Sequence, residues 1–212
     1  MTTAGLRERK KQRTRCALID SAFALFQRKG FDATTVDEIA EAVDVSPRTF
    51  FRYFTSKEEV ALSLLDDQLA ALLTMVEHRP ADESVLTALR NAGMEVLRAC
   101  EAGEAGFDPL RFESMQLLMS SNPALAAHAM EQGAARLTDM ARVIGTRMGV
   151  DHRVDPRPYL VASIALCTIQ TVVNAWRETE PDARSSDMVD RAFRLLADGI
   201  DYPSAPQHCS SE

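Results

Sequence analysis

Three signals for the start of a helix lie close together between residues 35 and 59, and they restrict the possible folds more than any other feature. Thr35-Val36-Asp37-Glu38 and Ser56-Lys57-Glu58-Glu59 both place Glu three residues after Thr or Ser, which is the capping-box pattern. Between them, Ser46-Pro47 combines an N-cap residue with proline at the first helical position. The sequence therefore predicts two short helices, over about residues 35–43 and 47–54, followed by a long one.

A further helix precedes these two. Apolar residues recur on one face between about residue 13 and Lys29, and Gly30 follows at the position of a C-terminal cap. Of these three helices, the last two are joined by a tight turn at Asp44-Val45, which is the order of a helix-turn-helix unit. Leu, Ala and Met carry most of the aliphatic content of the chain. That composition favours helix over strand and predicts an all-α fold of about nine helices.

In a helix-turn-helix unit, the second helix of the pair enters the major groove of DNA. Here that helix is 47–54, where Phe50 and Phe54 are four residues apart and share one face, so we expect them to anchor it to the core. The remaining side chains are then available to DNA: Arg48, Thr49, Phe51, Arg52 and Tyr53. Arginine can pair with guanine through two hydrogen bonds, hydroxyl groups reach phosphate oxygens, and phenylalanine can contact a thymine methyl.

The charge distribution also indicates DNA binding by the N-terminal part. Residues 1–57 carry 11 Lys and Arg against 7 Asp and Glu, whereas the remainder carries 13 against 24. Six of the basic residues lie between Arg7 and Arg15, in a segment that is either a solvated tail or an arm along the DNA backbone or minor groove. Lys57 and the pair Thr34-Thr35 lie at helix starts, where we expect contacts to phosphate.

Residues 18–62 resemble the N-terminal domain of the tetracycline-repressor (TetR) family, through the motifs LFQRKGF, ATTVDEIA, VSPRTFFRYF and SKEEV. The resemblance implies a homodimeric, all-helical repressor with nine or ten helices and a C-terminal effector domain. By position, it also implies DNA contacts from Thr35, Arg48, Thr49, Phe51, Tyr53 and Lys57. The sequence departs from the family at Asp44, where glycine is usual. Aspartate tolerates a left-handed backbone better than most residues, so the turn remains plausible.

The rest of the chain is predicted to be helical over about residues 57–76, 82–101, 109–121, 123–148, 157–178 and 186–199. We divide the chain into a DNA-binding domain with its basic arm (1–57), a ligand-binding and dimerisation domain (58–202) and a disordered tail (203–212). The segment RFESMQLLMSSNPALAAHAMEQ, together with Trp176-Arg177, resembles the C-terminal domain of a subgroup that includes the mycofactocin-system regulator. That resemblance implies acyl-CoA-like ligands.

The second domain has residues suited to a largely apolar effector, because methionine-rich linings adapt to a ligand. The candidates are Met94, Leu97, Phe112, Met115, Leu118, Met119, Thr168 and Thr171. For each apolar candidate, the alternative is an ordinary place in the core. The helices 157–178 and 186–199 are expected to pair with their twofold mates, which would hold two reading helices about 34–36 Å apart on a palindromic operator.

Other classes of function are disfavoured. The chain has no GxSxG, HExxH or Glu-x-x-His pattern and no Gly-rich phosphate loop, so we expect neither an enzyme nor a metal or cofactor site. The four cysteines, Cys16, Cys100, Cys167 and Cys209, form no CxxC pair and read as structural thiols, with a thiol-sensing regulator as the alternative. A second alternative function is that of a protein-binding adaptor on a helix-turn-helix scaffold. Without a long apolar run or a signal peptide, we expect a cytoplasmic protein without membrane contact.

Overall fold

The computed structural model describes residues 3–177, 179–180 and 182–200, and within these ranges every regular element is a helix. The described residues form ten helices. They are α1 (Thr3–Lys29), α2 (Val36–Glu41), α3 (Pro47–Phe50), α4 (Lys57–His78), α5 (Val85–Ala102), α6 (Pro109–Ser121), α7 (Pro123–Glu131), α8 (Gly133–Met148), α9 (Arg157–Arg177) and α10 (Ser185–Asp198). The predicted all-α class is confirmed. The predicted tail, 203–212, lies outside the described residues.

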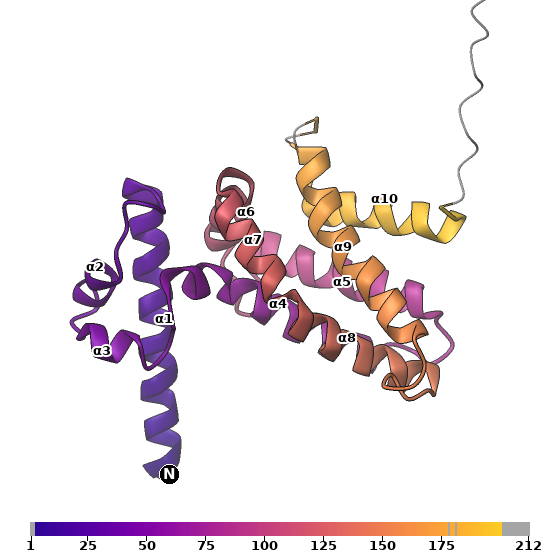
Figure 1. The fold of residues 1–212 in the computed structure, drawn as a ribbon, viewed down its shortest axis with the longest axis horizontal. Coiled ribbons are helices and arrows are strands. Elements are labelled where there is room, and N and C mark those ends of the chain that lie inside the picture. The colour runs from indigo at the N-terminus through magenta and orange to yellow at the C-terminus, as the bar shows by residue number, and fades with distance from the viewer. Residues whose placement is uncertain (1–2, 178, 181, 201–212) are drawn as a thin grey trace, which may run out of the picture.

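The helices form two groups joined by α4 (Figure 1). The first group, which we call the head, is α1–α3, and α1 projects past α3 at its N-terminal end. The second group, the body, holds α4–α10. Within the body, α8 packs along α9 and α5 packs along α10. Because α9 and α10 lie at the end of the molecule opposite the head, any signal from them must pass through α4–α8.

Two helix boundaries in the head differ from the prediction. α1 begins at Thr3 rather than near residue 13, so the basic segment expected as an arm is helical. That segment is rich in Arg, Lys, Glu and Gln, which favour helix even where no apolar face is buried. α3 ends at Phe50, and residues 51–53 form turns instead of completing a helix to Phe54. The N–H of Phe54 still bonds the carbonyl of Phe50 at 3.1 Å, so the chain continues to coil.

The helix predicted over 123–148 is two helices, α7 and α8, separated at Gln132. In an uninterrupted helix, the carbonyl of Ala129 accepts a hydrogen bond from the N–H four residues on, at Gly133. Here the guanidinium of Arg136 donates to that carbonyl, at 3.1 Å. Glycine at the next position also favours helix poorly. A long side chain thus competes with the backbone at this point, which no periodicity in the sequence reveals.

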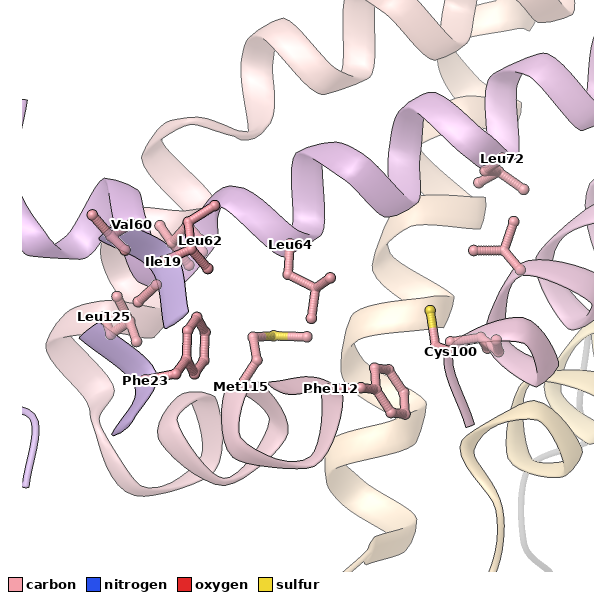
Figure 2. Close-up of a cluster of buried hydrophobic side chains, with 14 of the residues drawn as sticks. Ile19, Phe23, Val60, Leu62, Leu64, Leu72, Cys100, Phe112, Met115 and Leu125 are labelled. Carbon is pink, nitrogen blue, oxygen red and sulfur yellow. The ribbon is translucent and has the colours of Figure 1, made fainter. Parts of the chain in front are cut away.

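One continuous apolar core joins the head to the body (Figure 2). Ile19 and Phe23 of α1 lie beside Val60 and Leu62 of α4 and Leu125 of α7, and the cluster continues through Met115 of α6. Each such side chain stabilises the fold by about 1.5–3 kcal/mol when it is fully buried. Because these contacts cross between the two groups, α1 cannot move independently of α4, α6 and α7.

Candidate nucleic-acid interface and effector pocket

The turn between α2 and α3 has the predicted conformation. Asp44 has a φ of 54°, in the left-handed region, where residues other than Gly, Asn or Asp are disfavoured. The N–H of Val45 bonds the carbonyl of Ala40 at 3.0 Å and closes the turn. On the far side, the hydroxyl of Ser46 accepts the N–H of Thr49 at 3.2 Å, so Ser46 caps α3 as predicted. These local bonds fix the direction in which α3 leaves the turn.

The predicted capping box also opens α2. The hydroxyl of Thr35 accepts the N–H of Glu38 at 3.3 Å, and the carboxylate of Glu38 accepts the N–H of Thr35 at 2.9 Å. A hydrogen bond from Lys29, the largest cause, and the bonds from Thr35 lower the pKa of Glu38 to about 2. The carboxylate is therefore charged at neutral pH, and it ties the end of α1 to the start of α2.

Phe50 and Phe54 anchor α3, as expected. Both are buried, and their ring centroids lie 5.8 Å apart. Phe51, by contrast, is 55% exposed, and Arg48 and Arg52 are exposed beside it. The fold thus leaves an aromatic ring and two guanidinium groups on the outer face of α3 and the turn after it. The ring of Phe51 contacts the buried ring of Phe50 with its centroid 5.5 Å away, and more than half of its surface stays exposed.

Tyr53 lies between this outer face and α1. Arg52 donates to the Tyr53 hydroxyl at 3.4 Å, and its guanidinium carbon lies 5.2 Å from the centre of the Tyr53 ring. Burial alone raises the pKa of Tyr53, but hydrogen bonds from Arg52 and Thr14 and the charges of Arg52 and Lys11 outweigh it, so the pKa is lowered. The side chain thus belongs to a strongly positive surface.

An open groove runs between the first half of α1 and α3. The residues that line it are Arg7, Lys10, Lys11, Thr14, Val45, Thr49, Arg52 and Tyr53. The four from α1 lie at positions i, i+3, i+4 and i+7, so they share one face of the helix. From the sequence, these basic residues form either a solvated tail or an arm along the DNA. Their helical conformation instead gives them fixed positions alongside the predicted reading residues.

Lys57 and Thr34 were expected to contact phosphate, but their polar side-chain atoms point into the head. The ammonium of Lys57 donates to the carbonyls of Phe31 at 2.8 Å, Thr34 at 3.0 Å and Asp32 at 3.2 Å. A lysine has three protons to donate, so these bonds occupy all of them. Thr34 is 1% exposed, and its hydroxyl donates to the carbonyl of Gly30 at 2.8 Å. Lys57 therefore holds the loop between α1 and α2 rather than presenting a free cation.

Thr35 is exposed, but its hydroxyl donates to the carboxylate of Glu38 at 2.8 Å. It therefore serves the N-terminal cap of α2 in this structure. The sequence indicated that Thr34, Thr35 and Lys57 lie at helix starts, and in the structure Thr35 is the N-cap of α2, Thr34 precedes it and Lys57 is the first residue of α4. It also indicated the bond between Thr35 and Glu38. It did not indicate that Lys57 and Thr34 bond carbonyls of the loop between α1 and α2, because those partners are far from Lys57 in the sequence or follow the end of α1.

The body contains a half-open apolar pocket with a volume of about 80 Å³ between α4, α5, α8 and α9. Its lining residues are Leu65, Gln68, Leu69, Leu72, Gly93, Val96, Leu97, Arg136, Leu166 and Ile169. Of the residues predicted to contact a ligand, Leu97 lies in this lining. The predicted residues lie on the helices expected over 82–101, 109–121 and 157–178, whereas the pocket lies between α4, α5, α8 and α9.

The other predicted ligand residues lie elsewhere. Phe112 and Met115 are buried in the core of Figure 2, and Leu118 and Met119 are partly buried against it. Met94 lines a separate open groove on the surface of α4 and α5, with Arg79 and Arg98. Thr168 is half-buried on α9, and the side chain of Thr171 lies outside the described residues. Apolar residues pack a core or line a pocket equally well, so the sequence did not separate the two.

Arg136 is the charged residue in the pocket lining. It is only 7% exposed. Its guanidinium pairs with Asp66 of α4, with Nε at 3.0 Å and Nη2 at 2.9 Å from the same carboxylate oxygen. Nη2 also donates to the side chain of Gln132 at 3.4 Å, and Nη1 donates to the carbonyl of Ala129. Arg136 thereby connects α4, the end of α7 and the pocket.

Cys100 is unsuited to redox sensing. It is buried, and burial, the largest effect, together with the nearby charge of Glu101 raises the pKa of its thiol to about 11 despite a contact with Gln68. The reactive form of cysteine is the thiolate, which this environment disfavours. Cys16 is half-buried and Cys167 is exposed, while Cys209 lies outside the described residues. Among the side chains that the structure describes, no group of His, Cys, Asp and Glu has the arrangement of a metal site.

Comparison with known proteins gives two family matches. The pattern of the bacterial regulatory proteins of the tetR family matches residues 18–64, and that of the MftR C-terminal domain matches residues 83–201. Both resemblances inferred from the sequence are thus confirmed. None of the helices described here is long and apolar enough to cross a membrane.

Individual relatives extend over most of the chain. The HTH-type transcriptional regulator TcmR of Streptomyces glaucescens is 40% identical over 173 residues, which cover 81% of this chain and 76% of that protein. MftR of Mycobacterium tuberculosis is 25% identical over 193 residues, covering 91% and 94%. The crystal structure of Thermus thermophilus FadR, a TetR-family repressor in complex with lauroyl-CoA, has a TM-score of 0.52 at 24% identity, with 91% and 97% covered. These relatives are transcriptional regulators rather than enzymes.

Proposed function

Because the chain belongs to the TetR family of transcriptional regulators, we propose that it is a dimeric repressor that a small, largely apolar effector releases from a palindromic operator. The observation that carries this proposal is the arrangement of the two candidate sites. A basic, aromatic surface on α1 and α3 and an apolar pocket in the body share one continuous core. A ligand that changes the position of α4 therefore also changes the position of α1.

We assign the major groove to α3 and the turn after it. Arg48 and Arg52 are the candidates for guanine, Phe51 for a thymine methyl, and Thr49 and Tyr53 for phosphate. The first half of α1 supplies further phosphate contacts through Arg7, Lys10 and Lys11. These residues line one groove together with residues of α3 and the turn after it. Lys57 and Thr35 are assigned to holding this surface in place, since their polar atoms already bond the head itself.

The subunits are proposed to associate through α9 and α10. Leu160 on α9 and Leu195 on α10 are 61% and 46% exposed, and Ile164, one turn after Leu160, is half-exposed. Large apolar side chains on one outer face suit a helix pair that packs against its twofold mate. We expect Leu160→Asp to convert the dimer to a monomer in sedimentation velocity, whereas Leu117→Asp, at an equally exposed site on α6, leaves the dimer intact. A dimeric Leu160→Asp variant would contradict this assignment.

Acyl-CoA esters are the effector class to test first, because the FadR of similar fold was crystallised with lauroyl-CoA. The 80 Å³ pocket is too small for a long acyl chain, so such a ligand must displace side chains as it enters. The test is to titrate lauroyl-CoA into the complex of the full chain with labelled DNA from upstream of its own gene, and to follow fluorescence anisotropy. Release at micromolar ligand supports an acyl effector, and unchanged affinity across a series of acyl lengths contradicts it.

A further inference from the structure

The effector pocket is uncharged overall, although it contains a buried arginine. Apart from Gln68 and Arg136, the lining residues are apolar. The charge of Arg136 is already balanced by Asp66, whose carboxylate accepts from Nε and Nη2. A ligand that brings a negative charge into this pocket therefore meets no uncompensated cation, and an apolar wall stabilises a buried charge poorly.

Arg136 nevertheless has hydrogen-bonding capacity left. Its Nη1 carries two protons. One donates to the carbonyl of Ala129 at 3.1 Å, and the other has no acceptor among the residues that the structure describes. A buried N–H without an acceptor is unfavourable. The bond from Nη2 to Gln132, at 3.4 Å, is also long. A ligand oxygen at the pocket wall would satisfy the guanidinium without disturbing its pair with Asp66.

Gly93 gives the same pocket its shape. It is buried in the middle of α5, where glycine is less favourable than any residue except proline. Packing does not require glycine here, because an added Cβ would meet nothing closer than the Cδ1 of Leu72, at 4.0 Å, an ordinary contact. The absence of a side chain leaves space in the lining, at a position where alanine would stabilise the helix.

From these contacts we infer that the part of the effector that enters this pocket is uncharged and apolar and has a carbonyl-type oxygen, which accepts a hydrogen bond from Arg136 while the apolar part lies against Gly93. The inference rests on the proposed function, because it specifies the ligand of the same pocket. Arg136 is then the residue that determines specificity. A carboxylic acid of the same shape, charged at neutral pH, binds more weakly, because Asp66 already neutralises the guanidinium.

Three probes of one ring size separate the chemistry: acetophenone has a carbonyl, benzoate has a carboxylate, and toluene has neither. Their binding to the full-length protein is measured by ligand-observed NMR at millimolar concentrations. We expect acetophenone to bind at least about tenfold more tightly than toluene or benzoate, the effect of one well-formed hydrogen bond to a charged donor. Benzoate binding as tightly as acetophenone would overturn the inference about charge.

Substitutions locate the effect. Arg136→Met should remove the advantage of acetophenone over toluene. Arg136→Lys keeps a charge beside Asp66 and should also reduce that advantage, so it serves as the test if the methionine variant does not fold. Arg142→Met, on the exposed face of α8, is the matched control and should change nothing. An acetophenone advantage that survives both Arg136 changes would show that Arg136 does not bind the oxygen.

Gly93→Val separates this inference from the proposed function. We expect it to weaken all three probes by filling the pocket, while anisotropy with operator DNA shows that the head still binds. If valine blocks the probes but they bind alike in the unsubstituted protein, the pocket remains the ligand site and the role of Arg136 is wrong. If no probe binds, or valine has no effect on binding, the pocket itself is not the effector site.

Discussion

Gly93→Ala should stabilise the protein, which is unusual for a change at a buried position. Alanine is more favourable than glycine in a helix interior by about 1 kcal/mol. The added methyl group approaches Leu72 at 4.0 Å without a clash, and its burial contributes up to about 0.8 kcal/mol more. We therefore expect a gain of about 1–2 kcal/mol in the free energy of unfolding. For a chain of this size, each kcal/mol raises the Tm by about 2–4 °C.

The assay is urea denaturation at one fixed protein concentration, since dissociation of a dimer makes the midpoint depend on concentration. Gly145→Ala in α8 is the matched control, because its Cβ would lie 3.0 Å from the carbonyl oxygen of Val150. It has the same gain in helix propensity but a backbone clash, so we expect destabilisation. A Gly93→Ala variant that is less stable than the unsubstituted protein would refute the conclusion that the pocket has room for the methyl group.

Three further predictions concern the head. Lys57→Ala removes a donor from the carbonyls of Phe31 and Thr34, and that of Phe31 keeps the N–H of Thr34 as a second donor. The free energy of unfolding should therefore fall by about 1–3 kcal/mol, and a chain of unchanged stability would contradict the inward role of Lys57. Lys11→Ala should lower the slope of log Kd against log salt by about 0.9, the loss of one phosphate contact, and an unchanged slope would place α1 away from DNA. The pKa of Glu38 is about 2 in the folded protein and 4.5 ordinarily, so its contribution to stability is complete above about pH 4.5 and is lost as the pH falls towards 2. The stability difference between the unsubstituted protein and Glu38→Gln should therefore shrink over that interval, and a constant difference would contradict the role of the charge.

The sequence predicted those parts of the head whose bonds are local. Thr35 bonds Glu38 and Ser46 bonds Thr49, each three residues away, so the residue types alone indicate the caps. Phe50 and Phe54 were identified as anchors in the same way, from their spacing on one helix. The left-handed turn at Asp44 was also expected, because aspartate tolerates that backbone conformation better than most residues.

Contacts between distant residues were not predictable in this way. Lys57 bonds carbonyls 23 to 26 residues earlier in the chain, and Arg136 pairs with Asp66, 70 residues away. Such partners depend on how the helices pack, which one sequence does not specify. The sequence did not separate pocket-lining residues from core residues for a similar reason, because Met115 suits a lining and a core equally well. The helical start of α1 was missed because periodicity detects buried faces, and the side chains described between residues 5 and 13 are exposed.

The most direct test of the central claim is a hydroxyl-radical footprint of the full-length protein on the DNA upstream of its own gene. A dimer with two reading helices predicts two protected half-sites related by a palindrome, with centres separated by about one helical turn or a multiple of it. Arg52→Ala should abolish or weaken that protection while non-specific binding at low salt persists. Uniform protection without half-sites, equal for both proteins, would contradict the account of a sequence-reading repressor.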